Sequence, residues 1–110
     1  MIYLASPYSH PDPAVREDRF RAACLAAAGL LRQGQAVFSP IAHSHCVATV
    51  GDIDPSWALW REGDLRLLEA CDQVVVLRLP GWDRSVGVAE EVARAEGRGI
   101  PVTHLDRSDG

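Results

Sequence analysis

Two adjacent carboxylates, Glu90 and Glu91, stand in the segment DRSVGVAEEVARA, where a loop is expected to turn into a helix. The exposed backbone N–H groups at a helix N-terminus favour a bound anion such as a sugar phosphate. A carboxylate one turn further along the helix could act on the molecule that is held there. The sequence therefore raises the question of which glutamate has a chemical role.

The helical projection gives the two glutamates different surroundings. At about 100° per residue, Glu90 points away from the apolar face and lies four residues before Arg94, a spacing that favours a solvent-side ion pair. Glu91 borders the apolar face, which includes Val88 and Ala95, and loss of water there raises the pKa of a carboxyl. Glu91 either reaches water from this border or has a function, and the helix pattern leaves both open.

A second acidic residue, Asp64, interrupts an apolar pattern in the preceding helix. The apolar stripe around it comprises Trp57, Trp60, Leu67, Leu68 and Cys71. A buried acid without partners costs several kcal/mol, so Asp64 is either a hydrogen-bonded hub or a functional group. Two carboxylates in different surroundings are typical of enzymes that break glycosidic bonds.

His43 and His45 invite a metal interpretation, which their spacing does not favour. Residues two apart suit neither chelation from one helix face nor a standard zinc site, and no second ligand cluster accompanies them. We therefore expect no metal and no other cofactor. Instead of binding a metal, these histidines are expected to line a ligand crevice or a subunit contact. Tyr3 and the tryptophans are expected in the core, whereas Tyr8 lies in a loop and could touch a base or sugar.

The elements that position these residues alternate between strand and helix. Apolar runs and helical spacing predict strands at 2–5, 35–39, 72–79 and 100–105, and helices at 13–34, 55–71 and 86–98, with a short helix or loop at 43–50. This order predicts an α/β three-layer, flavodoxin- or Rossmann-like fold, with a parallel sheet of four to five strands flanked by helices. We expect one domain over residues 1–110 that ends in a loose tail at 106–110.

Three segments follow the predicted strand ends and carry polar side chains. They are SPYS with Ser6 and Tyr8, SPIAHSH with His43 and His45, and LPGWDRSVG with Ser85 and Gly87. Ligands of parallel α/β sheets bind beyond the carboxyl ends of the strands. We therefore expect the three segments to converge on one crevice.

Composition and charge exclude several classes of partner. The formal net charge is -4, so a binding surface for a nucleic acid polymer is not expected. The longest apolar stretch, 22–31, is too short to span a membrane, and the first residues lack the features of a signal peptide. Cys24, Cys46 and Cys71 are expected as free, buried thiols in a reducing cytoplasm. A chain of 110 residues favours a homodimer or a higher homo-oligomer.

These motifs resemble the nucleoside 2-deoxyribosyltransferase superfamily, which includes the 2'-deoxynucleoside 5'-monophosphate N-glycosidases. Ser85-x-Gly87-x-x-x-Glu91-Val92-x-x-Ala95 is similar to its signature, and IYLASPYS is similar to its first strand and turn. The stretch from Asp64 to Asp72, followed by VVVL, is similar to the element before its third strand. The chain is particularly similar to a subgroup that shares YLASPYSHPDP, FSPIAHSH and GWxxSxGVxxE, and the resemblance covers Met1 to Leu105.

The resemblance implies cleavage or transfer of the N-glycosidic bond of a (deoxy)nucleoside or nucleoside 5'-monophosphate. It implies that Glu91 is the nucleophile at C1' and that Asp64 orients or protonates the sugar or base. It further implies that Ser85 and Gly87 are donors to a phosphate or 5'-hydroxyl. Ser6 and Tyr8 would line the pocket. Cations for a phosphate would come from Arg84 and from Arg16 or Arg19. It also implies an oligomer in which a neighbour completes the site. A catalytically silent nucleotide-binding or sensing module is the alternative, and an assembly protein is a third possibility.

Overall fold

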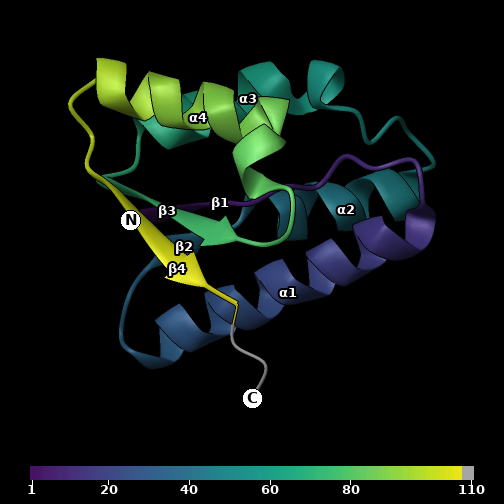
Figure 1. Cartoon of the computed structure of the whole chain (residues 1–110), viewed down its shortest axis with the longest axis horizontal. Helices are drawn as coiled ribbons and strands as arrows, with labels where there is room; N and C mark the ends of the chain where they lie inside the picture. The colour runs from purple at the N-terminus through teal and green to yellow at the C-terminus, as the bar shows by residue number, and fades with distance from the viewer. Residues whose placement is uncertain (108–110) are drawn as a thin grey trace.

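The computed structural model describes residues 1–107, in which four parallel strands form one sheet between layers of helices (Figure 1). The elements in chain order are β1 (Ile2–Ala5), α1 (Pro13–Arg32), β2 (Val37–Phe38), α2 (Pro40–Gly51), α3 (Trp57–Glu69), β3 (Gln73–Arg78), the 3-10 turn η1 (Trp82–Arg84), α4 (Val86–Gly97) and β4 (Val102–Asp106). The strands lie in the order β2-β1-β3-β4. The predicted α/β fold with a parallel sheet is therefore confirmed.

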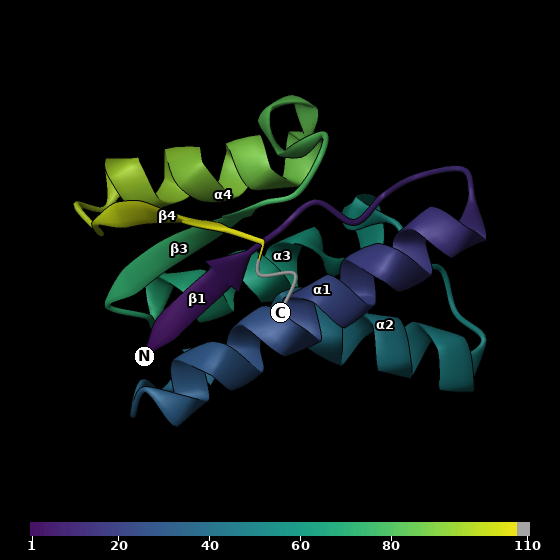
Figure 2. The same ribbon diagram turned by 60° about the horizontal axis from the view of Figure 1, so that its bottom comes forward.

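Helices cover both faces of the sheet. On one face, Leu4 and Leu77 pack against small and apolar residues of α1 such as Ala22. On the other face, Tyr3 and Val76 pack against α3 and α4. The helix α2 runs beside α1 (Figures 1 and 2). The strands β1 and β3 are buried on both sides, as their continuous apolar runs require. Within residues 1–107, no helix combines the length and apolarity that a membrane crossing needs.

Two helices differ from their expected form. The segment left open as a short helix or loop is a full helix, α2, with Pro40 in its first turn and the Ser39 side chain accepting from the Ala42 N–H at 3.1 Å. The next helix, α3, begins at Trp57 rather than at Pro55, with Ser56 as its N-cap. Pro55 therefore belongs to the connection between the two helices.

The apolar stripe expected on α3 is also shifted. Leu67 is 44% exposed, whereas Leu65, which the projection left out, is buried together with Leu68. The helix packs against both the sheet and α4, so its buried face is wider than one row of residues. Asp64 lies inside this wider face and is itself buried.

The end of the last strand is held by ion pairs. Asp106 is the last residue of β4 and accepts from Arg78 on β3, and Arg107 forms an ion pair with Asp18 on α1 at 2.8 Å. The loose tail expected at 106–110 therefore does not include these two residues. The rest of that expectation, at 108–110, lies outside the described residues.

The cysteines are free thiols, as expected, but they are not equally buried. Cys71 is buried against the sheet and Cys24 is partly buried, whereas Cys46 on α2 is exposed. The expectation of a buried side chain is therefore wrong for Cys46. Its position on the outer surface of α2 follows from the helix, because the neighbours that turn inward are Ser44 and Ala48.

Candidate active site

The segments that follow β1, β2 and β3 border one cavity of about 530 Å³ together with α3 and α4. The chain crosses from β1 to β2 through α1 on one face, and from β3 to β4 through α4 on the other. The cavity thus lies at the topological switch point between β1 and β3, where such sheets bind ligands. Its lining is formed by Ser6, Tyr8, Ser9, His10, Arg19, Ile41, Ser44, Pro55, Trp57, Trp60, Asp64, Gly81, Arg84, Ser85, Val86, Gly87 and Glu91.

Glu91 is the most deeply buried carboxyl of this lining. Its side chain is 3% exposed, and its Oε2 accepts a hydrogen bond from the hydroxyl of Tyr3 on β1. Burial raises the pKa of Glu91 to about 8, although the Tyr3 hydrogen bond favours the ionised form and acts in the opposite direction. Glu91 therefore does not reach bulk water from the border of its helix.

Asp64 is the second buried carboxyl in the cavity. Its side chain projects from α3 and is 5% exposed, and no residue of the described chain donates a hydrogen bond to it. Burial alone raises the pKa of Asp64 to about 6. The hub interpretation needed protein partners for this carboxyl, and residues 1–107 provide none.

The charge of Asp64 acts on Glu91. The negative charge of Asp64 raises the pKa of Glu91 further, in addition to the larger effect of burial. Because the two groups titrate at different pH, one can be protonated while the other is ionised. Such a pair of unequal carboxyls can combine an acid with a nucleophile or a base.

Ser85 and Gly87 lie at the start of α4 and both line the cavity. Ser85 is the N-cap of this helix, and its Oγ accepts from the Val88 N–H at 3.2 Å. Its hydroxyl proton remains available to a ligand. Gly87 packs against the indole of Trp57, which lies 3.4 Å from where a Cβ would stand. The glycine therefore makes room for Trp57 at the cavity wall.

Ser6 and Tyr8 follow β1 and line the cavity as well. The Ser6 Oγ is buried and has no hydrogen-bond partner among the described residues. Unpaired buried hydroxyls are costly in folded proteins and are commonly paired with a ligand or with water. Tyr8 is buried, and its hydroxyl is hydrogen-bonded to His45.

His43 and His45 do not line this cavity, although their segment borders it. His43 is exposed and meets the ring of Trp60 edge-on, with ring centroids 6.0 Å apart. The Nδ1 of His45 lies 2.7 Å from the Tyr8 hydroxyl, so His45 stands behind the cavity wall. Within residues 1–107, no group of three or more His, Cys, Asp or Glu side chains could hold a metal ion.

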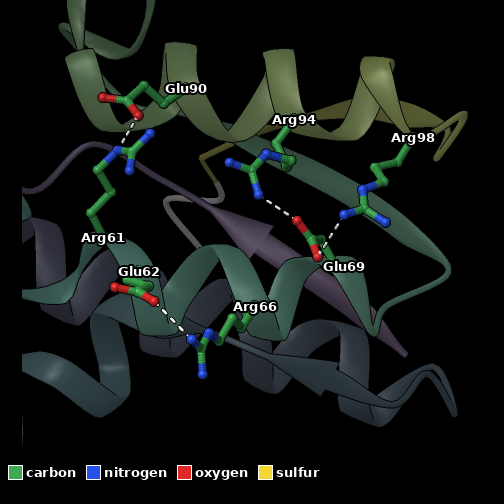
Figure 3. Close-up of polar contacts among 7 residues, drawn as sticks. All are labelled: Arg61, Glu62, Arg66, Glu69, Glu90, Arg94 and Arg98. Carbon is green, nitrogen blue, oxygen red and sulfur yellow. Dashed lines mark hydrogen bonds and ion pairs between the residues drawn. The ribbon is translucent and has the colours of Figure 1, made fainter.

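Glu90 has different partners from those its helical spacing predicted. It pairs with Arg61 of α3 and accepts from the Trp57 Nε1 at 3.2 Å, whereas Arg94 pairs with Glu69 (Figure 3). The predicted pair within α4 is therefore wrong, because α3 lies alongside α4 and offers closer partners. The Arg61 and Trp57 hydrogen bonds lower the pKa of Glu90. Glu90 thereby fixes a tryptophan of the cavity wall.

Arg19 brings positive charge to the cavity. Its guanidinium donates to the carbonyl oxygens of Ser9 and Pro80, both at 3.0 Å, and it pairs with no carboxylate of the described chain. Burial lowers the pKa of Arg19 without discharging an arginine at neutral pH. Arg84 lines the same cavity, so two of the three arginines named as possible phosphate partners face it.

Sequence reasoning missed three aromatic residues of the site. Tyr3 was expected in the core, and its ring is indeed buried, but its hydroxyl is the partner of Glu91. Trp57 and Trp60 were expected in the core and instead line the cavity. Their spacing from Asp64 was a usable signal, since residues 57, 60 and 64 share one face of a helix.

The fold and the site define an α/β protein that carries an acidic, aromatic-walled cavity at the carboxyl ends of a parallel sheet. The chain belongs to the family described as "Domain of unknown function (DUF1937)", whose model matches residues 1–107. No curated protein matches the chain.

Proposed function

We propose that the protein cleaves or transfers the N-glycosidic bond of a (deoxy)nucleoside or nucleoside 5'-monophosphate, with Glu91 as the nucleophile. The observation that carries this proposal is the pair of buried carboxyls, Glu91 and Asp64, in a single cavity. Burying two acids is unfavourable, and a site that only held a nucleotide would have no need of them. The resemblance of the surrounding motifs to the nucleoside 2-deoxyribosyltransferase superfamily supports the same chemistry.

The proposed reaction proceeds through a covalent intermediate. The carboxylate of Glu91 bonds to C1' while the C1'–N bond breaks, and the electron pair of that bond leaves with the base. Asp64, or a water that it holds, orients or protonates the sugar or base. Attack by water on C1' then releases the sugar and frees Glu91, or attack by a second base gives a new nucleoside.

The ionisation of Glu91 is the main electrostatic requirement. With a pKa of about 8, only a minor fraction of the empty protein has an ionised nucleophile at neutral pH. The Tyr3 hydroxyl favours the ionised form, and burial keeps that hydroxyl protonated because it raises the pKa of Tyr3. Positive charge that develops on the sugar in the transition state would favour the ionised form further.

The cavity suits a nucleoside or nucleotide in size and chemistry. Small-molecule sites commonly enclose about 300–1,000 Å³, and this one encloses about 530 Å³. Trp57 and Trp60 offer flat surfaces on which a base could stack. Arg19, Arg84 and the Ser85 hydroxyl offer cations and a donor to a 5'-phosphate.

A silent nucleotide-binding module is the second candidate, and one observation favours it. Burial lowers the ionisation of Glu91 so far that a neutral carboxyl could simply donate a hydrogen bond to a bound nucleotide. Incubation with deoxynucleosides and their 5'-monophosphates, followed by chromatography for free base, separates the two candidates. Base release supports the enzyme, whereas calorimetric binding without base release at long times supports the module.

Self-association is a separate prediction. We propose a homodimer or a higher homo-oligomer, which is supported by the small size of the domain and by exposed apolar side chains such as Val50 and Val86. Light scattering at several protein concentrations measures the oligomeric state directly. A monomer at every concentration would contradict this prediction and would leave the proposed chemistry untouched.

A further inference from the structure

A chain of hydrogen bonds leads from the cavity to the protein surface. Tyr8 lines the cavity, and its hydroxyl lies 2.7 Å from the His45 Nδ1. The His45 Nε2 lies 2.8 Å from a carboxylate oxygen of Glu17. The three side chains come from the loop after β1, from α2 and from α1. The His45 side chain is 13% exposed and that of Glu17 is 53% exposed, so only the outer end of the chain is open to water.

The ring of His45 is fixed in its plane by stacking. Phe20 of α1 lies parallel to it, with ring centroids 4.1 Å apart and an interplanar angle of 23°. The charged and titratable groups of the outer pocket around the ring are Arg16 and Glu17 from α1 and Tyr8 from the loop. Arg16 donates to the backbone carbonyl of His10, and it also faces the Tyr8 hydroxyl. Burial raises the pKa of Tyr8, and the charge and hydrogen bond of Arg16 act in the opposite direction. Glu17 is the carboxylate that faces His45.

The partners of the ring determine the direction of each hydrogen bond. A carboxylate can only accept, so the His45 Nε2 carries a hydrogen that it donates to Glu17. In the neutral ring the Nδ1 is then an acceptor, and the Tyr8 hydroxyl donates to it. In the imidazolium form the Nδ1 also carries a hydrogen, and the Tyr8 hydroxyl proton turns toward the cavity. The charge state of His45 thus decides whether Tyr8 presents an acceptor or a donor to a ligand.

From this geometry we infer that Tyr8 is the proton donor to the leaving base, with His45 as the source of the proton and Glu17 as the group that holds His45. This inference rests on the proposed function. As the C1'–N bond breaks, its electron pair goes to the base nitrogen, which takes the Tyr8 hydroxyl proton. The Tyr8 oxygen takes the His45 Nδ1 proton, and His45 ends neutral with its Nε2–H on Glu17. In the second step the bond between Glu91 and C1' breaks as water bonds to C1', and the proton that this water loses returns to His45 through Tyr8. Asp64 is left to orient the sugar or base.

The kinetic test compares leaving groups in His45→Asn. The asparagine amide can still bond Tyr8 near the Nδ1 position, but it cannot be protonated or reach Glu17. A general acid contributes about 10²–10⁴-fold to the rate, so kcat for a nucleoside 5'-monophosphate should fall by about 10²-fold or more. A para-nitrophenyl deoxyriboside leaves without a proton, and its loss should be far smaller. Equal losses on both substrates, or no loss on either, would overturn the inference.

A second measurement reports on the hydrogen-bonded chain without any turnover. The His45 ring N–H resonances are compared by NMR in the wild-type protein, in Glu17→Gln and in the surface control Glu62→Gln, which removes an equal charge from an exposed ion pair on α3. Glu17→Gln replaces the carboxylate acceptor of the His45 Nε2–H, so it should shift that resonance, and the control should not. An Nε2–H resonance that stays in place in Glu17→Gln would overturn the chain. If the wild type releases no base from any substrate, the proposed function fails, while this comparison still decides the hydrogen-bonded chain.

Discussion

The Tyr3 hydroxyl on β1 donates a hydrogen bond to the carboxyl of Glu91 on α4, inside the layer between sheet and helix. The two residues are 88 positions apart in the chain, and both are almost fully buried. The contact joins the central part of the sheet to the helix that borders the cavity. Among residues 1–107 it is the one side-chain hydrogen bond to Glu91, and it favours the ionised form against the effect of burial.

Tyr3→Phe removes this donor and leaves the ring in place. A hydrogen bond to a charged group contributes about 1.5–3 kcal/mol, so the pKa of Glu91 should rise further in the variant. The rise of kcat/KM with pH should move to higher pH, and kcat/KM at neutral pH should fall by about 10-fold or more. A pH–rate profile of the variant beside the wild type makes the measurement. A profile that keeps its position would show that Tyr3 only fills space.

Stability should depend on pH through Glu91 in a defined direction. Its pKa is about 8 in the folded protein and 4.5 as the ordinary value, so the folded state holds the proton more tightly than the unfolded state in this range. The free energy of unfolding should therefore fall as the pH rises from about 4.5 to about 8, by up to about 1.4 kcal/mol for each pH unit. Asp64, whose pKa is about 6 in the folded protein, also makes the free energy of unfolding fall as the pH rises, in a lower pH range.

Urea denaturation at several pH values tests this dependence with Glu91→Gln as the comparison. The neutral amide cannot ionise, so the variant should lose most of the fall and should be more stable than the wild type above about pH 8. A control substitution, Glu96→Gln, changes an exposed side chain of the same helix and should keep the wild-type curve. Parallel curves for Glu91→Gln and the wild type would contradict a strongly raised pKa.

Glu90 should affect ligand binding through Trp57. Glu90→Ala removes the acceptor of the Trp57 Nε1 and the partner of Arg61, so the indole should lose its fixed position and ligand affinity should fall about 3- to 10-fold, the effect of about one hydrogen bond. Glu69→Ala is the matched control, since it breaks the ion pairs with Arg94 and Arg98 (Figure 3). Glu69 and Trp57 lie at opposite ends of α3. Equal effects of the two variants on affinity, measured by calorimetry, would contradict a role for Trp57.

Arg19 should distinguish a phosphorylated from an unphosphorylated ligand. A charge-assisted contact with phosphate contributes about 1.5–3 kcal/mol, so Arg19→Gln should weaken binding of a nucleoside 5'-monophosphate by about 10- to 100-fold. Affinity for the matching nucleoside is the internal control, because any general damage to the loops that Arg19 ties together lowers both affinities alike. An equal loss of affinity for both ligands would show that Arg19 does not bind the phosphate.

The sequence was sufficient to predict the features that follow from the hydrophobic pattern within a single strand or helix. The run VVVL predicts a strand buried on both faces, and helical periodicity places Glu91 at the border of an apolar face. The same periodicity identifies Asp64 as an acid inside an apolar stripe. These patterns place both carboxyls beside the core, because periodicity reports on which face of a helix meets the core. For Glu91 the pattern left open whether the side chain reaches water, and only the structure shows that it is buried.

The relationships that cross between elements could not be predicted in this way. Tyr3 lies in a strand whose residues are all buried, so no alternation marks its hydroxyl as functional. Glu90 has Arg94 at the right spacing on its own helix, but Arg61 on the neighbouring helix is the closer partner. His45 belongs to a polar segment whose helical form was left open, and only its contacts with Tyr8 and Glu17 support the role that we propose for it.

The most direct test of the proposed chemistry is base release by Glu91→Gln, with Glu96→Gln as its control on the same helix. Wild type and control should release free base from a deoxynucleoside or its 5'-monophosphate, and Glu91→Gln should lose at least about 10³-fold in rate, as expected when a nucleophile is removed. Mass spectrometry of a quenched wild-type reaction should find the sugar attached to Glu91. Undiminished base release by Glu91→Gln, or its loss in Glu90→Gln alone, would contradict the assignment of the nucleophile.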